Sequence, residues 1–311
     1  MNGYKIINQF KNMKSTINKI TVIVFFLSFI LCASIIFGRD IFVNSTVGDD
    51  NNSGLNERDN GLKGGPVRTI KRGIKLAKQG DRIVLDPTEP YKESITLSGK
   101  DVCGRSLDSA FVIEGRGAVL EGTEPIPFDV WQFYKDNIFR FQLTLPDVNL
   151  TYFHIMKDGK TLKRINVAID AAKLPELEPE SWCILRGYVY FRTNGKKSPM
   201  FAEDYNLTYS ARKAGISIIQ ATNIKINDLT IRGYQLDGVA AVNGATNIIL
   251  DNITCIQNGR SGLTIGGASS VAAGYSRFAD NKTTQVLLLK YARYIFHQCN
   301  IPKNGITKSN E

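Results

Sequence analysis

Residues 222–267 read TNIKINDLTIRGYQLDGVAAVNGATNIILDNITCIQNGRSGLTIGG, and this segment repeats itself. The letters NIKI at 223–226 return 24 positions later as NIIL at 247–250. Both copies alternate apolar and polar residues, which is typical of β-strands with one buried face. The segment therefore predicts two copies of one strand-containing unit.

The repeat continues toward the C-terminus with nearly constant spacing. The pairs expected to point inward are Leu229 and Ile231, Ile253 and Cys255, Ser276 and Phe278, and Cys299 and Ile301. Units of this length built from short strands are typical of a solenoid. Leucine-rich repeats require a leucine framework that is missing here, and helical repeats require a period of 3.6 residues. The interpretation is an all-β fold, a parallel β-helix whose rungs stack about 4.8 Å apart.

A column of asparagines follows the same spacing. Asn258, Asn281 and Asn304 are each 23 residues apart. Asparagine tolerates left-handed backbone dihedrals at bends, and stacked amides can hydrogen-bond to one another. We expect this column to be structural rather than ligand-binding.

The N-terminal part predicts a cap and the first rungs, residues 39–126. DIFVN at 40–44 is expected to form a strand, and VRTIKRGIKLAKQG at 67–80 a helix that Gly80 ends. Val67, Ile70, Ile74 and Ala77 lie on one face of this helix. Such a helix can cover the open end of a solenoid, which would otherwise expose strand edges and apolar core.

This opening resembles that of secreted right-handed parallel β-helix proteins of the pectate-lyase-like superfamily. In those proteins a short strand precedes a G-x-D-x-x-x-G loop, a helix with T-I-x-x-A-I-x-x-A, a G-D-x-I strand and a Y-x-E-x-I rung. The chain matches with GDDNNSG at 48–54, TIKRGIKLA at 69–77, GDRI at 80–83 and YKESI at 91–95, and Gly73 replaces the usual alanine. The resemblance implies the fold and a carbohydrate-active function, but it does not identify a substrate.

Residues 127–208 interrupt the rung pattern and are predicted to form a β-rich insert, before the rungs resume at 209–311. The insert is similar to a small subdomain found in several secreted glycosidase-like β-helix proteins. It contains Trp131 and Trp182. Buried core and sugar binding both remain open for these side chains, and core is the commoner role.

Residues 1–38 are expected to be an export signal. Four of the 39 basic residues and none of the 29 acidic residues lie there, and an apolar run follows the lysines. Cleavage after Gly38 would yield a secreted, periplasmic or cell-surface protein. The alternative is an uncleaved anchor through residues 20–38, the only membrane contact we expect. The rest of the chain has a net charge of +6, so nucleic acid is not an expected partner.

Cysteine spacing beyond the signal segment indicates neither a metal site nor a disulfide framework. Cys103, Cys183, Cys255 and Cys299 are widely spaced and form no C-x-x-C pair. A chain of this length can build its core without disulfides. We expect free thiols.

Four charged residues are candidates for a site because we expect them to point outward from the rungs: Asp237, Arg260, Asp280 and Lys282. No motif of the family can be transferred to them residue by residue. In a lyase, Lys282 or Arg260 would take the proton α to a uronate carboxylate, with Asp237 and Asp280 available for calcium. In a glycosidase, the two aspartates would be the catalytic pair, although they lie four positions out of register.

Three functions are compatible with these features. The first is an enzyme, a polysaccharide lyase or glycoside hydrolase; the second is a non-catalytic module that binds extracellular polysaccharide. The third is an inactive, shortened family member, since no cap is recognisable near residue 311. Polysaccharide is the expected partner, and the cofactor is undetermined except for calcium in a lyase.

Overall fold

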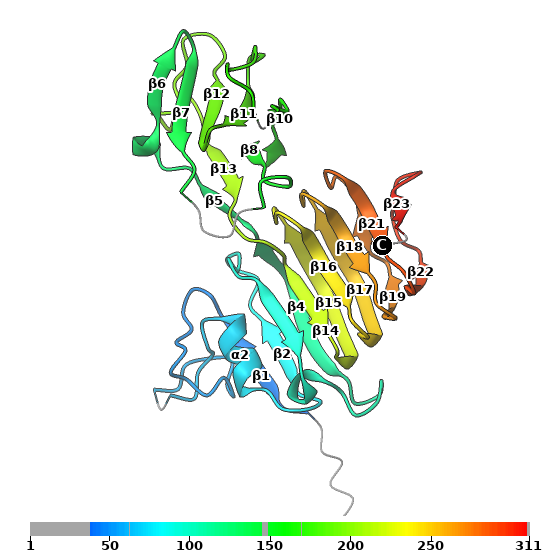
Figure 1. The fold of residues 1–311 in the computed structure, drawn as a ribbon. Helices are drawn as coiled ribbons and strands as arrows, with labels where there is room; N and C mark the ends of the chain where they lie inside the picture. Colours follow the sequence, from blue (N-terminus) through cyan, green and yellow to red (C-terminus); the bar gives the residue numbers. More distant parts are fainter. Residues whose placement is uncertain (1–37, 62, 145–148, 169, 310–311) are drawn as a thin grey trace, which may run out of the picture. The chain divides into compact units, whose positions relative to one another are not determined.

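The structure is a computed structural model that describes residues 38–61, 63–144, 149–168 and 170–309. The export-signal prediction therefore falls almost wholly outside the described residues. No helix in the described ranges is long and apolar enough to cross a membrane. Two parallel sheets and an insert of smaller sheets make up the described part (Figure 1).

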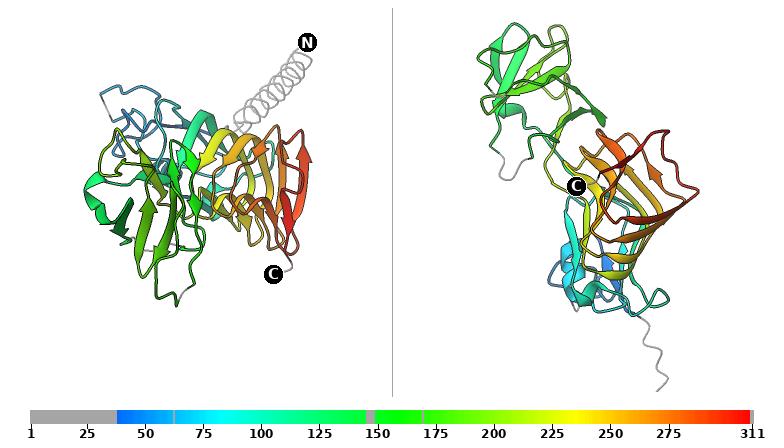
Figure 2. Two further views of the ribbon diagram at one scale, coloured as in Figure 1. Left: turned by 90° about the horizontal axis from the view of Figure 1, so that it is seen from above. Right: turned by 45° about the vertical axis from the view of Figure 1, so that its right-hand side comes forward.

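The first parallel sheet runs in the order β1-β2-β4-β15-β17-β19-β22, and β20 also pairs with β17. Its strands are β1 (Asp40–Val43), β2 (Arg82–Leu85), β4 (Phe111–Glu121), β15 (Thr222–Arg232), β17 (Thr246–Ile256), β19 (Ser270–Gly274), β20 (Arg277–Phe278) and β22 (Arg293–His297). The second sheet runs β3-β14-β16-β18-β21-β23. Its strands are β3 (Ile95–Ser98), β14 (Ile216–Ile219), β16 (Asp237–Val242), β18 (Ser261–Ile265), β21 (Thr284–Leu288) and β23 (Ile306–Lys308). From β14 onward the chain alternates between the sheets, so each circuit adds one rung (Figure 2).

Each long strand of the first sheet bends at a residue with a positive φ. Asp228 has φ 50° in β15, Asn252 has φ 52° in β17, and Tyr275 has φ 50° between β19 and β20. Asp and Asn adopt this left-handed conformation more readily than most residues. The Asn252 side chain also donates to Asp228 at 2.9 Å. The bends therefore stack. Each bend divides a strand of the first sheet into two straight segments, so a rung has three straight segments with the strand of the second sheet.

The predicted rung register is confirmed. Leu229 pairs with Ile253 in the parallel ladder, and Cys255 pairs with both Ile231 and Phe278. These five side chains are at most 2% exposed and belong to one continuous core. Fully burying an aliphatic or aromatic side chain contributes about 1.5–3 kcal/mol. Stacked apolar side chains therefore provide the main stabilisation of the rungs.

The asparagine column forms a hydrogen-bonded ladder, with one correction. Tyr234 N donates to Asn258 Oδ1 at 3.1 Å, and Asn258 N donates to Asn281 Oδ1 at 3.0 Å. Asn281 N then donates to Gln285 Oε1 at 2.9 Å. Asn304 does not join the ladder, because the Gln285 amide takes the third place. Asn304 lies exposed on a turn and has a φ of 65°.

The predicted cap helix is shorter than expected. Helix α2 (Ile70–Leu76) begins after Thr69, whose Oγ1 accepts from Arg72 N at 3.1 Å. The backbone becomes extended at Ala77, so Gly80 does not end the helix. Val67, Ile70 and Ala77 are buried in the rung core, as the sequence predicts, and Ile74 packs against it. Two further segments are short 3-10 helices, η1 (Lys100–Val102) and η2 (Phe128–Val130).

The insert consists mainly of two small sheets. One has the order β10-β11-β12-β7-β6, and the other β5-β13-β8-β9. Their strands are β5 (Thr123–Pro125), β6 (Gln132–Lys135), β7 (Ile138–Gln142), β8 (Ile155–Lys157), β9 (Lys160–Thr161), β10 (Lys163–Arg164), β11 (Ser181–Leu185), β12 (Tyr188–Arg192) and β13 (Leu207–Ser210). Trp131 is 3% exposed and Trp182 is fully buried in the insert core. Both tryptophans are therefore core residues.

Candidate functional site

Asp237 is not an outward-pointing residue, contrary to the expectation from sequence. It opens β16 and is 1% exposed. Its carboxylate accepts from Arg260 Nε at 2.9 Å and Nη2 at 2.5 Å, and from the hydroxyls of Ser261 at 2.8 Å and Thr264 at 3.0 Å. Both carboxylate oxygens are thus occupied by donors inside the rung stack.

Arg260 is committed to the same pair. The hydrogen bonds and the negative charge of Asp237 raise the pKa of the Arg260 guanidinium, so Arg260 stays protonated. A buried carboxylate with a bidentate arginine partner is costly to separate. We conclude that Asp237 and Arg260 hold neighbouring rungs together and are unsuited to act as acid, base or metal ligand.

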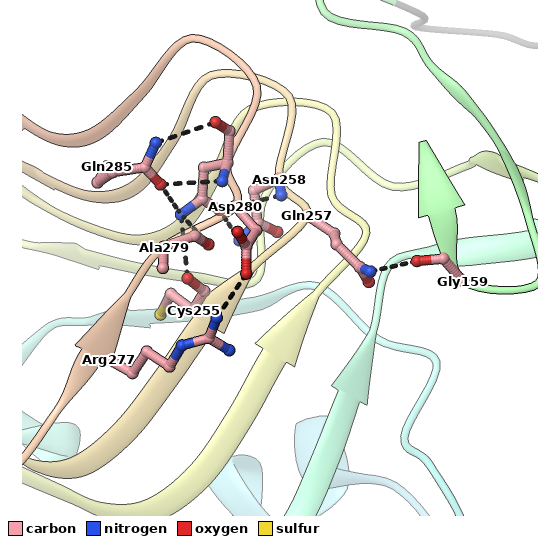
Figure 3. Close-up of polar contacts among 9 residues, drawn as sticks. Gly159, Cys255, Gln257, Asn258, Arg277, Ala279, Asp280 and Gln285 are labelled. Atoms are coloured by element: carbon pink, nitrogen blue, oxygen red, sulfur yellow. Dashed lines mark hydrogen bonds and ion pairs between the residues drawn. The ribbon is translucent and has the colours of Figure 1, made fainter. Parts of the chain in front are cut away.

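Asp280 occupies a different environment. It lies on the turn after β20 with φ 58°, and its side chain is 63% exposed. Its carboxylate pairs with Arg277 Nη2 at 2.5 Å (Figure 3). The predicted aspartate pair is therefore divided between the interior and an exposed turn, with each carboxylate bound to an arginine. No group of three His, Cys, Asp or Glu side chains in the described ranges could hold a metal.

Lys282 is the one candidate of the four with an unengaged charge. Its backbone N–H donates to Asn258 O at 2.9 Å, which fixes the turn, and its side chain is exposed. The ammonium makes no hydrogen bond or ion pair within the described residues. Although the side chain is accessible, partial desolvation by surrounding protein atoms lowers its pKa, and the positive charge of Arg164 lowers it further.

Arg164 comes from the insert, at the end of β10. Its Nη1 donates to the carbonyl of Leu150 at 2.5 Å, and its guanidinium lies 5.2 Å from the Trp182 ring centre. Its Nε is buried and has no hydrogen-bond partner, and burial lowers the pKa of the group. No carboxylate in the described part pairs with it. The insert therefore presents a second cation whose charge is not balanced.

His154 adds a neutral ring to these two cations. It is 1% exposed, and its Nδ1 lies 3.1 Å from the carbonyl of Tyr152. Burial lowers its pKa to about 4, and the charge of Lys282 acts in the same direction. A carbonyl only accepts, so the proton of the neutral ring lies on Nδ1 and Nε2 is an acceptor. This Nε2 is fully buried and has no hydrogen-bond partner of good geometry in the described part, although the backbone of Gln257 lies close enough to the ring to act against the lowering of its pKa. We call His154, Arg164 and Lys282 the junction site.

Hydrogen bonds between insert and rungs position the junction site. Asn149 N donates to Gln235 Oε1 at 2.8 Å, and Gln235 Nε2 donates to Ser210 O at 3.0 Å. The Gln257 side chain, beside the asparagine ladder, donates to the carbonyl of Gly159 (Figure 3). These contacts attach the 149–164 segment to the turns that carry Gln235 and Asn258.

Comparison with known proteins supports the fold and not a particular activity. No protein-family model and no curated protein matches the chain. Among solved structures, the complex of XylC with xylose has a TM-score of 0.56 at 13% identity, covering 86% of this chain and 60% of that one. A glycoside hydrolase has a TM-score of 0.56 at 10% identity, covering 81% of this chain and 67% of that one. The predicted parallel β-helix is confirmed, and the chain spans about 60% of the length of XylC.

Proposed function

We propose that the chain binds an acidic polysaccharide at the junction site, outside the cell. The observation that carries this proposal is the pair of cations Arg164 and Lys282: the charge of Arg164 lowers the pKa of Lys282, and neither cation has a carboxylate partner in the described part. A carboxylate or sulfate between them would relieve their repulsion. Arginine and lysine are also the usual donors for such oxyanions.

The neutral ring of His154 adds no third positive charge beside the two cations near pH 7, because burial lowers its pKa to about 4. Its Nε2 is fully buried, so the contacts to the acidic group come from the two cations. Similarity to XylC, solved with xylose, also supports a saccharide ligand. The export segment expected at residues 1–38 would place the protein where extracellular polysaccharides occur.

Binding without turnover is favoured over hydrolysis. A glycosidase needs two available carboxyl groups, roughly 5 Å or 6.5–9.5 Å apart. Asp237 is occupied by four donors, and Asp280 is bound by Arg277. The junction site itself contains no carboxylate.

A lyase is the second candidate, and the lowered pKa of Lys282 favours it. A lysine that loses its proton more easily is a better general base near neutral pH. In this reaction Lys282 would take the proton α to a uronate carboxylate held by Arg164. The predicted use of Arg260 as base is not retained, because its pKa is raised by Asp237.

The test compares Lys282→Ala with Lys290→Ala, which removes the same charge beyond the other end of β21. Calorimetry with oligogalacturonate and its neutral methyl ester should show binding of the acidic form alone. Loss of one charge-assisted hydrogen bond, roughly 1.5–3 kcal/mol, should weaken binding by Lys282→Ala at least about tenfold. Absorbance of unsaturated products separates lyase from binder. Equal affinity of both variants would contradict the junction site.

A further inference from the structure

A second unbalanced cation lies on the insert, away from the residues of the junction site. Arg140 on β7 has its Cζ 5.4 Å from the ring centre of Tyr134 and 4.7 Å from that of Tyr188. These rings come from the neighbouring strands β6 and β12. Tyr134 also packs edge-on against Tyr190, with 5.2 Å between ring centres. The two tyrosines thus hold the guanidinium in one place, and we call Tyr134, Arg140 and Tyr188 the tyrosine clamp.

The charge of Arg140 is only partly compensated by these rings. Each cation–π contact contributes about 0.5–1 kcal/mol at an exposed site. Within the described residues Arg140 forms no ion pair, and its buried Nε has no hydrogen-bond partner. A guanidinium offers a planar fork of donors that matches the two oxygens of a carboxylate or sulfate. A pre-positioned fork loses little side-chain entropy when such a group binds.

A pocket of about 360 Å³ lies beside the clamp. Ile138 in its wall precedes Arg140 by two residues on β7 and therefore lies on the same sheet face, about 7 Å away. Lys135 and Arg192 both pair with Ile138 in the sheet and also line the pocket. The volume is at the small end of ligand pockets, which suits one or two sugar rings.

Two carboxylates restrict which ligand fits. Asp136 and Glu176 line the same pocket and are exposed. They accept hydrogen bonds from hydroxyl groups, whereas they repel additional negative charge. The combination favours a ligand with one acidic group and several hydroxyls over a densely charged polyanion.

We propose that the tyrosine clamp and the adjoining pocket bind an acidic saccharide. Arg140 holds a carboxylate or sulfate of the sugar, and Asp136 and Glu176 accept from its hydroxyls. The exposed face of Tyr134, which is 41% exposed, packs against the apolar face of the ring. The insert would then be a binding module with its own specificity, and this inference does not depend on the junction site.

The experiment uses the full chain and a disaccharide with a single uronic acid, its neutral alcohol counterpart and a monosulfated analogue. Calorimetry gives the affinity and the number of sites. Arg140→Gln should show one site fewer, because the affinity at that site falls at least about tenfold. Arg140→Lys should lose most of the affinity at the same site, because lysine lacks the planar fork. The uronic and sulfated ligands show which oxyanion binds better.

Controls separate this site from the junction and from misfolding. Lys196→Gln, on another exposed turn of the insert, should bind like the unmodified chain, and Lys282→Ala should keep the clamp site. Tyr134→Leu removes an exposed ring without removing charge and should weaken binding by about threefold. If Arg140→Gln misfolds, Tyr134→Leu and Arg140→Lys still decide the question. Unchanged affinity and stoichiometry in Arg140→Lys and Tyr134→Leu would overturn the proposal.

Discussion

The rung stack and the insert bury their cores in different ways. In the rungs, Cys255 lies between Ile231 and Phe278 because the chain returns to the same position after each circuit. In the insert, the centre of the Trp131 ring lies 4.8 Å from that of Phe141 and 5.9 Å from that of Phe191. Phe141 and Phe191 lie on the antiparallel strands β7 and β12, whose positions in the sequence follow no repeat. A periodic core can be read from sequence and is distributed over many rungs. The insert core depends instead on a few large aromatic side chains.

The largest expected effect tests this dependence directly. Trp182→Ala should destabilise the insert by about 3–5 kcal/mol, because a fully buried aromatic ring leaves a large cavity. Hydrogen exchange should accelerate throughout residues 127–208, while residues 224–256 keep their protection. Equal acceleration in both regions would show that insert and rungs unfold as one unit.

The next prediction concerns pH at the contact between the two regions. His154 has a folded-state pKa of about 4 against an ordinary value of 6.5, so between these values the unfolded chain binds a proton that the folded chain does not. Its contribution is full above pH 6.5 and falls as the pH drops toward 4, by up to roughly 3 kcal/mol. Urea unfolding from pH 7.5 to 4 should show a shallower decline in His154→Gln than in the unmodified chain. Identical slopes would mean that His154 titrates normally.

Two ion pairs within the rungs should contribute differently to stability, because one is buried and the other is exposed. Arg260→Ala leaves the Asp237 carboxylate buried without its main partner and should cost roughly 3 kcal/mol. Arg277→Ala breaks an exposed pair with Asp280 and should cost less than about 1 kcal/mol. Thermal unfolding of both variants measures the difference. Adding Asp237→Asn to Arg260→Ala should restore part of the loss, and no recovery would argue against a buried-charge penalty.

The smallest effect distinguishes members of the asparagine column. Asn258→Ala leaves the backbone N–H of Tyr234 without its acceptor inside the rungs, a loss of about 1–3 kcal/mol. Asn304→Ala removes an exposed amide outside the ladder and should change stability by less than about 0.5 kcal/mol. Denaturant midpoints of the two variants make the comparison. Similar losses would place Asn304 in the ladder after all.

Sequence reasoning succeeded where contacts follow the rung period. The pairing of Leu229 with Ile253 and the asparagine contact of 258 with 281 are both one repeat apart. The same spacing separates Asp237 from Arg260, so the buried ion pair could have been found by extending the period to polar residues. Spacing could not show that Gln285 replaces Asn304, because Gln285 lies only four residues after Asn281.

The junction site and the tyrosine clamp could not be derived from the sequence in the same way. The charge of Arg164 acts on Lys282 from an insert without internal period, and Arg140 meets its tyrosines across strands whose order follows no repeat. A cation can be called unpaired only when the positions of the surrounding carboxylates are known, and the sequence does not give those positions. Only Lys282 was predicted, because it lies on a rung turn.

The asparagine ladder also has a consequence for how such a molecule can change in length. The side-chain oxygens of Asn258 and Asn281 each accept a hydrogen bond from the preceding rung. Gln285 ends the series, because its side-chain oxygen accepts from Asn281 within the same rung. A duplicated unit of 23 residues inserted between Asn258 and Asn281 would therefore find a donor on one side and an acceptor on the other. Duplication by whole circuits preserves every amide contact, and the ladder already spans one interval of 24 residues and one of 23. The ladder thus makes the complete rung the unit of evolutionary growth and of protein design.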